Sequence, residues 1–140
     1  MAETFQFDLV TPERLLLSEP VRQVSAPGVE GSFGILAGHA PLLAELGIGV
    51  IRVERPNGQV ELVATSGGFL QATRDRVVIL ADTAELASEI DLERARAAEE
   101  KARQLLEIPG ELSAEEIRKM IERAQNRIRV AQMHQEQSPS

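Results

Sequence analysis

The hydrophobic residues of the chain follow a period of two up to about residue 88 and a period of three to four after it. At the start, Phe5, Phe7 and Leu9 alternate with Gln6 and Asp8, the pattern of a strand with one buried face. Further short runs cover 21–26 (a weaker alternation), 49–54, 59–64, 69–72 and 77–80. Short strands separated by turns at such spacing predict an antiparallel β-sandwich over residues 1–88. Asn57-Gly58, a tight-turn dipeptide, predicts that 49–54 and 59–64 form a hairpin.

Two helices are predicted after the sandwich, which makes the fold α+β. Asp91 is the expected N-cap of a helix over 92–107, and Pro109-Gly110 ends it. Ser113 and Glu116 form a capping box for a second helix. The apolar stripes are Ala95, Ala98, Ala102 and Leu105 on the first helix and Ile117, Ile121, Ala124, Ile128 and Ala131 on the second.

A short connection between two such helices implies an antiparallel hairpin, assigned to residues 89–134, and residues 135–140 are predicted to be a disordered tail. Alanine-rich stripes bury little apolar area, and burial contributes only roughly 25 cal/mol per Å². We therefore expect the hairpin to be held weakly and to act as a mobile element.

Charge and composition exclude several classes of function. Fifteen lysines and arginines against 22 aspartates and glutamates give a net charge of −7, so we expect no nucleic-acid partner. The chain has no cysteine, which rules out disulfides and thiolate chemistry. Because the start lacks a secretion-signal pattern and no apolar run reaches about 18 residues, we expect no direct membrane insertion.

The glycine-rich stretch PGVEGSFGILAGHAPLL (27–43) invites a phosphate-loop interpretation, but no lysine precedes residue 101 and no helix start follows the glycines. His39 has no nucleophile or carboxylate in a recognisable arrangement, so it is interpreted as a turn histidine that bonds to the backbone. The two histidines do not form a metal-ligand cluster. We therefore expect no catalytic residue and no metal, and the chain is predicted not to be an enzyme.

The basic residues of the helices are candidates for binding an anion. Arg123 and Arg127 share one helix face, as do Arg94 and Lys101, and in a closed hairpin Arg94 would approach Arg127. Converging guanidinium groups suit a phosphate. The alternative is a solvated surface on which nearby glutamates neutralise these charges: Glu93, Glu99, Glu100 and Glu122.

Several motifs together resemble the epsilon subunit of bacterial F-type ATP synthase, called delta in mitochondria. They are PGVEGSFGILAGHAPLL, GVIRV, SGGFL, VVILADTAE and IDLERA, in that order. The resemblance implies a central-stalk rotor subunit whose sandwich binds the gamma subunit and rests on the c-subunit ring. It further implies that the helices inhibit ATP hydrolysis when they extend into the alpha/beta catalytic head, and that the subunit lies at the cytoplasmic face of the bacterial inner membrane, peripheral to it. Glu30, Ser32 and His39 become interface candidates.

The same resemblance implies that ATP is a regulatory ligand of the folded-down hairpin, with no cofactor required. The matching positions are Glu85, Ile90, Asp91, Arg94, Ala95, Lys101, Arg123 and Arg127. Lys101 departs from the family, which usually has an arginine there, and a lysine keeps the charge but lacks the planar fork. The alternative stays open that the chain is a nucleotide-independent interaction module, because LVTPERLLLSEPV (9–21) resembles members that lack the ligand.

Overall fold

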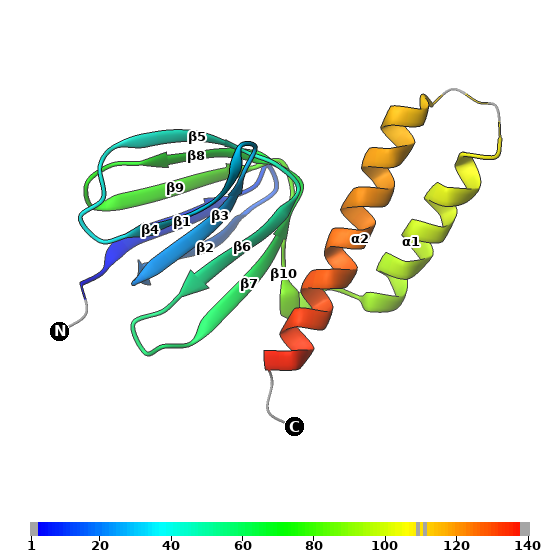
Figure 1. Cartoon of the computed structure of the whole chain (residues 1–140). Coiled ribbons are helices and arrows are strands. Elements are labelled where there is room, and N and C mark those ends of the chain that lie inside the picture. Colours follow the sequence, from blue (N-terminus) through cyan, green and yellow to red (C-terminus); the bar gives the residue numbers. More distant parts are fainter. Residues whose placement is uncertain (1–2, 109, 111, 138–140) are drawn as a thin grey trace. The chain divides into compact units, whose positions relative to one another are not determined.

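The structure is a computed structural model that describes residues 3–108, 110 and 112–137. It divides into two compact units, Met1–Leu86 and Ala87–Ser140 (Figure 1). The first unit is built from strands and the second from helices. Among the described residues, no helix combines the length and the apolar character needed to cross a membrane.

Ten strands make up the first unit. They are β1 (Phe5–Val10), β2 (Leu15–Val21), β3 (Gln23–Gly28), β4 (Gly31–Leu36), β5 (Leu42–Leu46), β6 (Gly49–Glu54), β7 (Val60–Thr65), β8 (Gly68–Ala72), β9 (Arg76–Ala81) and β10 (Ala84–Leu86). Hydrogen bonds connect them in the order β10-β7-β6-β3-β5-β8-β9-β1-β2, with β4 paired to β3. The predicted β-sandwich is confirmed. All strand pairs are antiparallel except β1 and β9, which run parallel.

The strand β3 carries the hydrogen bonding from one layer of the sandwich to the other. Its first half, Gln23–Ser25, pairs with β6, and its last residue, Gly28, pairs with Leu46 of β5. The layer β5-β8-β9-β1-β2 therefore faces the layer that contains β6 and β7. The core between them consists of the inward residues of each alternating strand, and those with the largest fully buried side chains include Phe7, Leu9, Ile51, Leu70 and Ile79.

The predicted hairpin of β6 and β7 is confirmed. In its turn, Gly58 alone of the Asn57-Gly58 pair has a positive φ. Gly58 has a φ of 87°, whereas no other type of residue has a positive φ in the described part of the chain. Asn57 instead uses its side chain, whose Oδ1 accepts a hydrogen bond from the backbone N–H of Gln59 at 2.9 Å.

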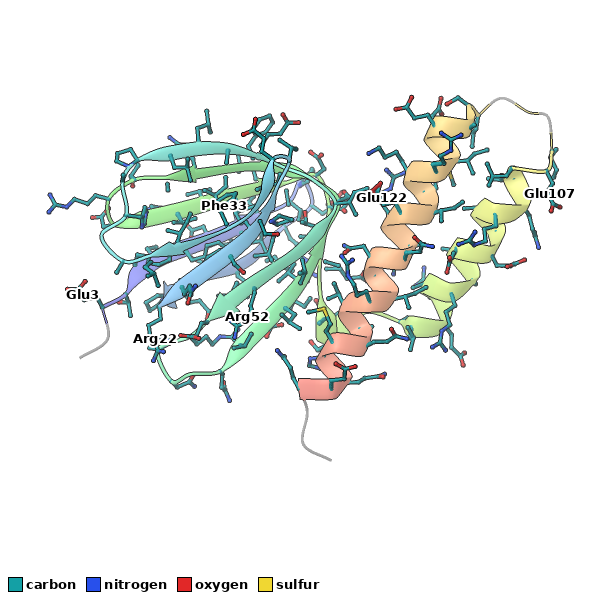
Figure 2. The ribbon with its side chains drawn as sticks, viewed as in Figure 1. Glu3, Arg22, Phe33, Arg52, Glu107 and Glu122 are labelled. Carbon is teal, nitrogen blue, oxygen red and sulfur yellow. The ribbon has the colours of Figure 1, made fainter. Side chains whose placement is uncertain are left out.

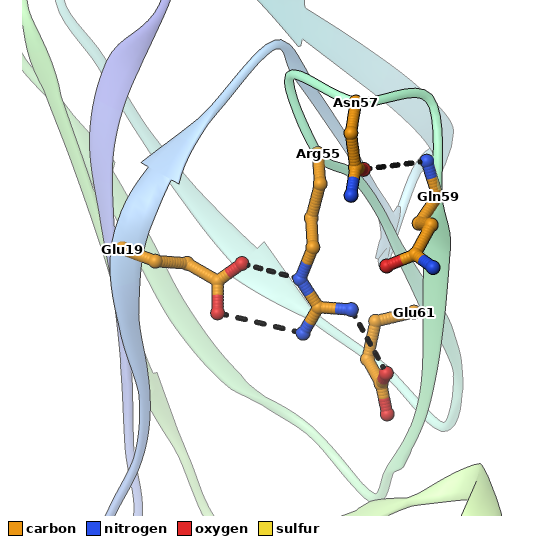
Figure 3. Close-up of polar contacts among 5 residues, drawn as sticks. All are labelled: Glu19, Arg55, Asn57, Gln59 and Glu61. Carbon is orange, nitrogen blue, oxygen red and sulfur yellow. Dashed lines mark hydrogen bonds and ion pairs between the residues drawn. The ribbon is translucent and has the colours of Figure 1, made fainter.

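An arginine in this turn joins the two ends of the sheet (Figure 3). The Nε of Arg55 lies 2.5 Å from Oε1 of Glu19 on β2, and its Nη1 lies 3.3 Å from Oε2 of Glu61 on β7. The strand β2 ends the hydrogen-bonded path, and β7 is next to its other end. Since β2 and β7 share no backbone hydrogen bonds, the two ion pairs of Arg55 connect strands that the sheet itself does not join.

The outer surface beside β6 is charged. Arg22 and Arg52, both labelled in Figure 2, approach the carboxylate of Glu54 at 2.7 Å and 3.9 Å. Both arginine side chains are largely exposed, so each pair contributes little stability.

The second unit contains a short 3₁₀ helix, η1 (Ala87–Glu89), and two α-helices, α1 (Leu92–Leu105) and α2 (Ala114–Gln137). The predicted caps are confirmed: Asp91 Oδ1 accepts from the N–H of Arg94 at 3.1 Å, and Ser113 Oγ accepts from the N–H of Glu116 at 3.1 Å. The first helix ends at Leu105, two residues earlier than expected.

The second helix continues to Gln137, so residues 135–137 are helical and do not belong to a disordered tail. The rest of the expected tail (138–140) and Pro109 lie outside the described residues.

The residues predicted to form the apolar stripes are buried or half-buried, except for one residue on α1. Ala95 and Ala102 on α1 are buried, and so are Ile117, Ile121, Ala124 and Ala131 on α2, while Leu105 and Ile128 are half-buried. Ala98, in contrast, is exposed, and Glu99 next to it is half-buried. The stripe on α1 therefore turns toward Glu99, and a carboxylate takes part in the contact between the helices.

Candidate functional site

A hydrogen bond between the two helices shows which of their residues lie opposite each other. The Nε2 of Gln125 on α2 donates to Oε2 of Glu99 on α1 at 3.0 Å. In an antiparallel pair, each step up one helix matches one step down the other, so Lys101 lies level with Arg123. By the same count, Arg94 and Arg127 are offset by three residues, about 4.5 Å along the axes.

The four predicted cations lie on one side of the hairpin. Each residue turns an α-helix by about 100°, which places Arg94 and Lys101 on the side of the α1 stripe opposite to Glu99. The same rotation places Arg123 and Arg127 on the side of the α2 stripe opposite to Gln125. Because Glu99 and Gln125 meet on one side, all four cations share the other.

Two of the nearby glutamates pair with other cations. Glu99 pairs with Arg103 at 2.7 Å, and Glu122 pairs with Lys119 at 3.6 Å. Within the described residues, no ion pair joins a carboxylate to Arg94, Lys101 or Arg123. The interpretation of these positions as a solvated surface and the interpretation as an anion site both stay predictions.

The other residues expected around ATP have different surroundings. Asp91 uses a carboxylate oxygen to cap α1, and Ala95 is fully buried in the stripe. Ile90 is half-buried just before the helix, and Glu85 lies on β10 of the first unit. The second unit by itself thus brings together the cations and the Asp91 cap.

The residues expected to contact partners lie around the β3–β4 turn and the segment after β4. Glu30 and Ser32 are exposed. The Nδ1 of His39 lies 2.8 Å from the carbonyl oxygen of Leu36, which confirms the turn histidine. Its ring meets Phe5 edge-on at a centroid distance of 5.2 Å, so packing and a backbone contact account for its position.

A row of apolar side chains crosses the outer face of the layer β5-β8-β9-β1-β2. Phe69 pairs with Leu80, Leu80 with Val10, and Val10 with Leu15. Phe69, Leu80 and Leu15 are 54%, 57% and 59% exposed. We call these four residues the outer apolar row, and its neighbour Leu43 on β5 is 72% exposed. Exposed apolar side chains aligned in this way are typical of an interaction surface.

The outer apolar row was not predicted, although the sequence carries a signal for it. The runs LLL (15–17) and VVIL (77–80) are apolar at consecutive positions, and in a strand such runs place apolar side chains on both faces. Asn126 and Val130, both buried on α2, were missed as well because they lie off the predicted stripe.

A polar network lies beside this row on the same face. The carboxylate of Asp8 accepts hydrogen bonds from Ser18 Oγ at 2.6 Å and from Gln6 Nε2 at 3.1 Å, and it pairs with Arg76. Asp8 itself is buried. The hydrogen bond from Ser18, followed by those from Gln6 and Arg76, lowers the pKa of Asp8.

Comparison with known proteins identifies the family. A family model described as the β-sandwich domain of the ATP synthase delta/epsilon chain matches residues 4–87. The chain belongs to the ATP synthase delta/epsilon family. An ATP synthase epsilon chain of Desulforamulus reducens is 44% identical over 133 residues, which cover 94% of this chain and 100% of the relative. One from Syntrophomonas wolfei is 42% identical, with 94% and 98% covered.

A solved structure agrees with the fold of the chain. It is a chain from the mitochondrial ATP synthase of Euglena gracilis, in a structure of its OSCP/F1/c-ring part, with a TM-score of 0.79 and 28% identity. The match covers 94% of this chain and 82% of that chain. As an epsilon-type member of the family, the chain is a non-catalytic subunit, as the sequence predicts.

The Asp8 network makes the stability of the sandwich depend on pH. A lowered pKa in the folded state contributes stability that is present above the unfolded value, about 3.9, and is lost as the pH falls through the folded value. We expect Asp8→Asn to lower the free energy of unfolding at pH 7 by about 1–3 kcal/mol and to flatten its decline below about pH 4.

Urea unfolding of both proteins between pH 2.5 and pH 7 measures this difference. Asp75→Asn is the control, because Asp75 is exposed. Parallel stability curves for wild type and Asp8→Asn would show that the network does not hold the carboxylate in its charged form.

Proposed function

We propose that the chain is a central-stalk rotor subunit of the proton-translocating F-type ATP synthase. In this proposal the sandwich binds the gamma subunit and couples it to the c-subunit ring, and the helical hairpin restrains ATP hydrolysis. The complex would hold the chain at the cytoplasmic face of the bacterial inner membrane, peripheral to the bilayer.

The observation that carries the proposal is the outer apolar row. It lies on a layer of five strands, and its members are aligned by strand pairing, with a register shift between Leu9 and Val10 on β1. Exposed apolar side chains held in place by a sheet suit a permanent protein partner, because the contact removes apolar area from water. The matched Euglena chain belongs to an assembly that contains F1 and a c-ring. We assign the row to gamma, and we assign the β3–β4 turn with Glu30, Ser32 and His39 to the c-ring side.

A charge in the outer apolar row is expected to release gamma. Phe69→Glu places a carboxylate where an apolar contact forms, so we expect the dissociation constant for gamma to rise at least roughly 30-fold. Co-purification of the two chains, followed by surface plasmon resonance, measures the change. Arg52→Gln is the control, because Arg52 lies on the charged surface beside β6. If Phe69→Glu retains gamma as tightly as the control does, the assignment of this face is refuted.

The second part of the proposal concerns the hairpin. Its apolar interior is small, formed by buried Ala102, Ile117 and Ile121 with Leu105 and Met120 packed against them. A helix pair with so little buried apolar area is easily rearranged by a partner that favours another arrangement. We infer that the hairpin reaches the alpha/beta head in the arrangement that inhibits hydrolysis.

Removal of the hairpin tests this role directly. A chain ending at Ser88 keeps all ten strands, so we expect it to fold and to assemble with gamma. We expect the ATPase rate of the truncated complex to be higher than that of the complete complex. Equal rates in complexes with matched subunit content would contradict the inhibitory role.

We further propose that ATP binds the closed hairpin and stabilises it. Support comes from the four cations on one side and from the absence of compensating carboxylates at Arg94, Lys101 and Arg123 within the described residues. A polyphosphate matches such a row of donors. The alternative function is a nucleotide-independent interaction module, in which the same cations contact acidic side chains of the catalytic head.

Calorimetric titration with ATP and Mg²⁺ separates the two functions. If ATP binds, Arg123→Ala should weaken the affinity by about 10–100-fold, the effect of losing a hydrogen bond to a charged group. Lys101→Arg should strengthen it, because a guanidinium grips a phosphate with two donors. Arg118→Ala is the control, because Arg118 lies on the side of α2 that carries Gln125. No heat at millimolar ATP would leave only the interaction module.

A further inference from the structure

One carboxylate oxygen connects the two helices of the hairpin. Oε2 of Glu99 accepts from Gln125 Nε2 at 3.0 Å across the hairpin, and from Nη2 and Nε of Arg103 on its own helix at 2.7 Å and 3.1 Å. The side chain of Glu99 is only 22% exposed. Three donors from two helices therefore converge on one carboxylate oxygen.

This contact is polar and directional. It is a side-chain hydrogen bond that joins α1 to α2. The rest of the interface consists largely of alanines and aliphatic side chains. Small apolar side chains discriminate poorly between neighbouring registers, because shifting them loses little area. A directional hydrogen bond does discriminate, since it fails when its partners separate by more than about 3.5 Å.

The register matters for the opposite side of the hairpin. With Glu99 opposite Gln125, Lys101 lies level with Arg123, and Arg94 and Arg127 follow farther along. A slip by one residue would move one helix by about 1.5 Å along its axis and require a rotation of about 100° to keep its stripe buried. Such a change would separate the cations that now share one side.

We propose that Glu99 and Gln125 are positioning residues that lock α1 and α2 in the register in which the four cations form one anion-binding surface. They do not touch the anion, because they lie on the other side of the hairpin. Arg103 keeps the carboxylate charged and oriented: its hydrogen bonds, together with that of Gln125, lower the pKa of Glu99. The proposal deepens the proposed ATP sensing, and its effect on ATP rests on that function.

The chain offers a matched exchange of the two partners. In the double variant Glu99→Gln/Gln125→Glu, the amide and the carboxylate trade places and the bond across the hairpin is retained in reverse. The new carboxylate at position 125 then has Arg129 four residues later, as Glu99 has Arg103; in the wild-type chain Arg129 Nη2 donates to Oδ1 of Asn126. The exchange thus retains the bond between the helices and places an arginine four residues after the carboxylate.

The test measures the hairpin register in the full-length chain. The natural sequence has no cysteine, so Ala97→Cys and Glu115→Cys introduce the only two attachment points for nitroxide labels. Both positions are exposed and point away from the facing helix. Double electron–electron resonance then gives the distribution of distances between the labels, and circular dichroism verifies that each variant remains helical.

We expect one narrow distribution in the wild-type background, a broader or shifted one in Glu99→Ala, and recovery of the narrow one in the exchanged variant. Arg103→Ala, which leaves the Gln125 bond in place but removes the partner that orients the carboxylate, should broaden the distribution less than Glu99→Ala does. An unchanged distribution in Glu99→Ala overturns the proposal. A broadened distribution that the exchange fails to restore also overturns it, because the pair would then not be the cause.

Titration with MgATP tests the consequence for the anion. We expect Glu99→Ala to weaken ATP about tenfold, which corresponds to about 1.4 kcal/mol, and the exchanged variant to recover the affinity. Equal ATP affinity in Glu99→Ala and wild type would overturn the link between register and binding. If the wild-type chain itself binds no ATP, the proposed sensing function fails, whereas the register lock is still decided by the label distances.

Discussion

Successive side chains of a strand point to opposite faces of the sheet. In one layer of this sandwich, that alternation determines both which residues form the core and which form the outer surface. On β1 the same alternation that buries Phe7 and Leu9 directs Asp8 and Val10 outward. Since Val10 then stands between Leu80 and Leu15, the core and the outer apolar row cannot be shifted independently. A register slip of one residue would expose the core and disrupt the outer apolar row together.

The hairpin obeys a weaker constraint, because its helices meet through small side chains. Alanines at positions 95, 102 and 124 allow close approach but contribute little buried area. Polar contacts then decide how the helices align, which gives Glu99 an influence that a surface carboxylate normally lacks. Dense packing of large side chains thus aligns the strands of the sandwich. In the hairpin, a directional hydrogen bond between small, closely packed helix faces aligns the helices.

The sequence was most informative where a single face of an element is buried. Clean alternation predicted β1, the Asn57-Gly58 turn predicted the hairpin of β6 and β7, and a continuous apolar run predicted most of β9. The caps at Asp91 and Ser113 were found because capping depends on neighbouring residues alone. The edge strand β2 was missed: it contains Pro20 and starts with three leucines, so neither face stands out. The glycines of β4 suggested turns. The cations on the hairpin were recognisable, but their alignment was not, because a register between two helices is a relation that no local pattern encodes.

The parallel pairing of β1 and β9 has a consequence for how the chain acquires its structure. Asp8 meets Arg76 across this pair, 68 residues away in sequence, and β1 lies between its hairpin partner β2 and the much later β9. During synthesis the first strand therefore leaves the ribosome long before its second neighbour exists. Closing so large a loop costs entropy before the contact repays it. Until β9 has emerged, the edge of β1 that does not pair with β2 consequently has no strand partner. The layer is completed only after that.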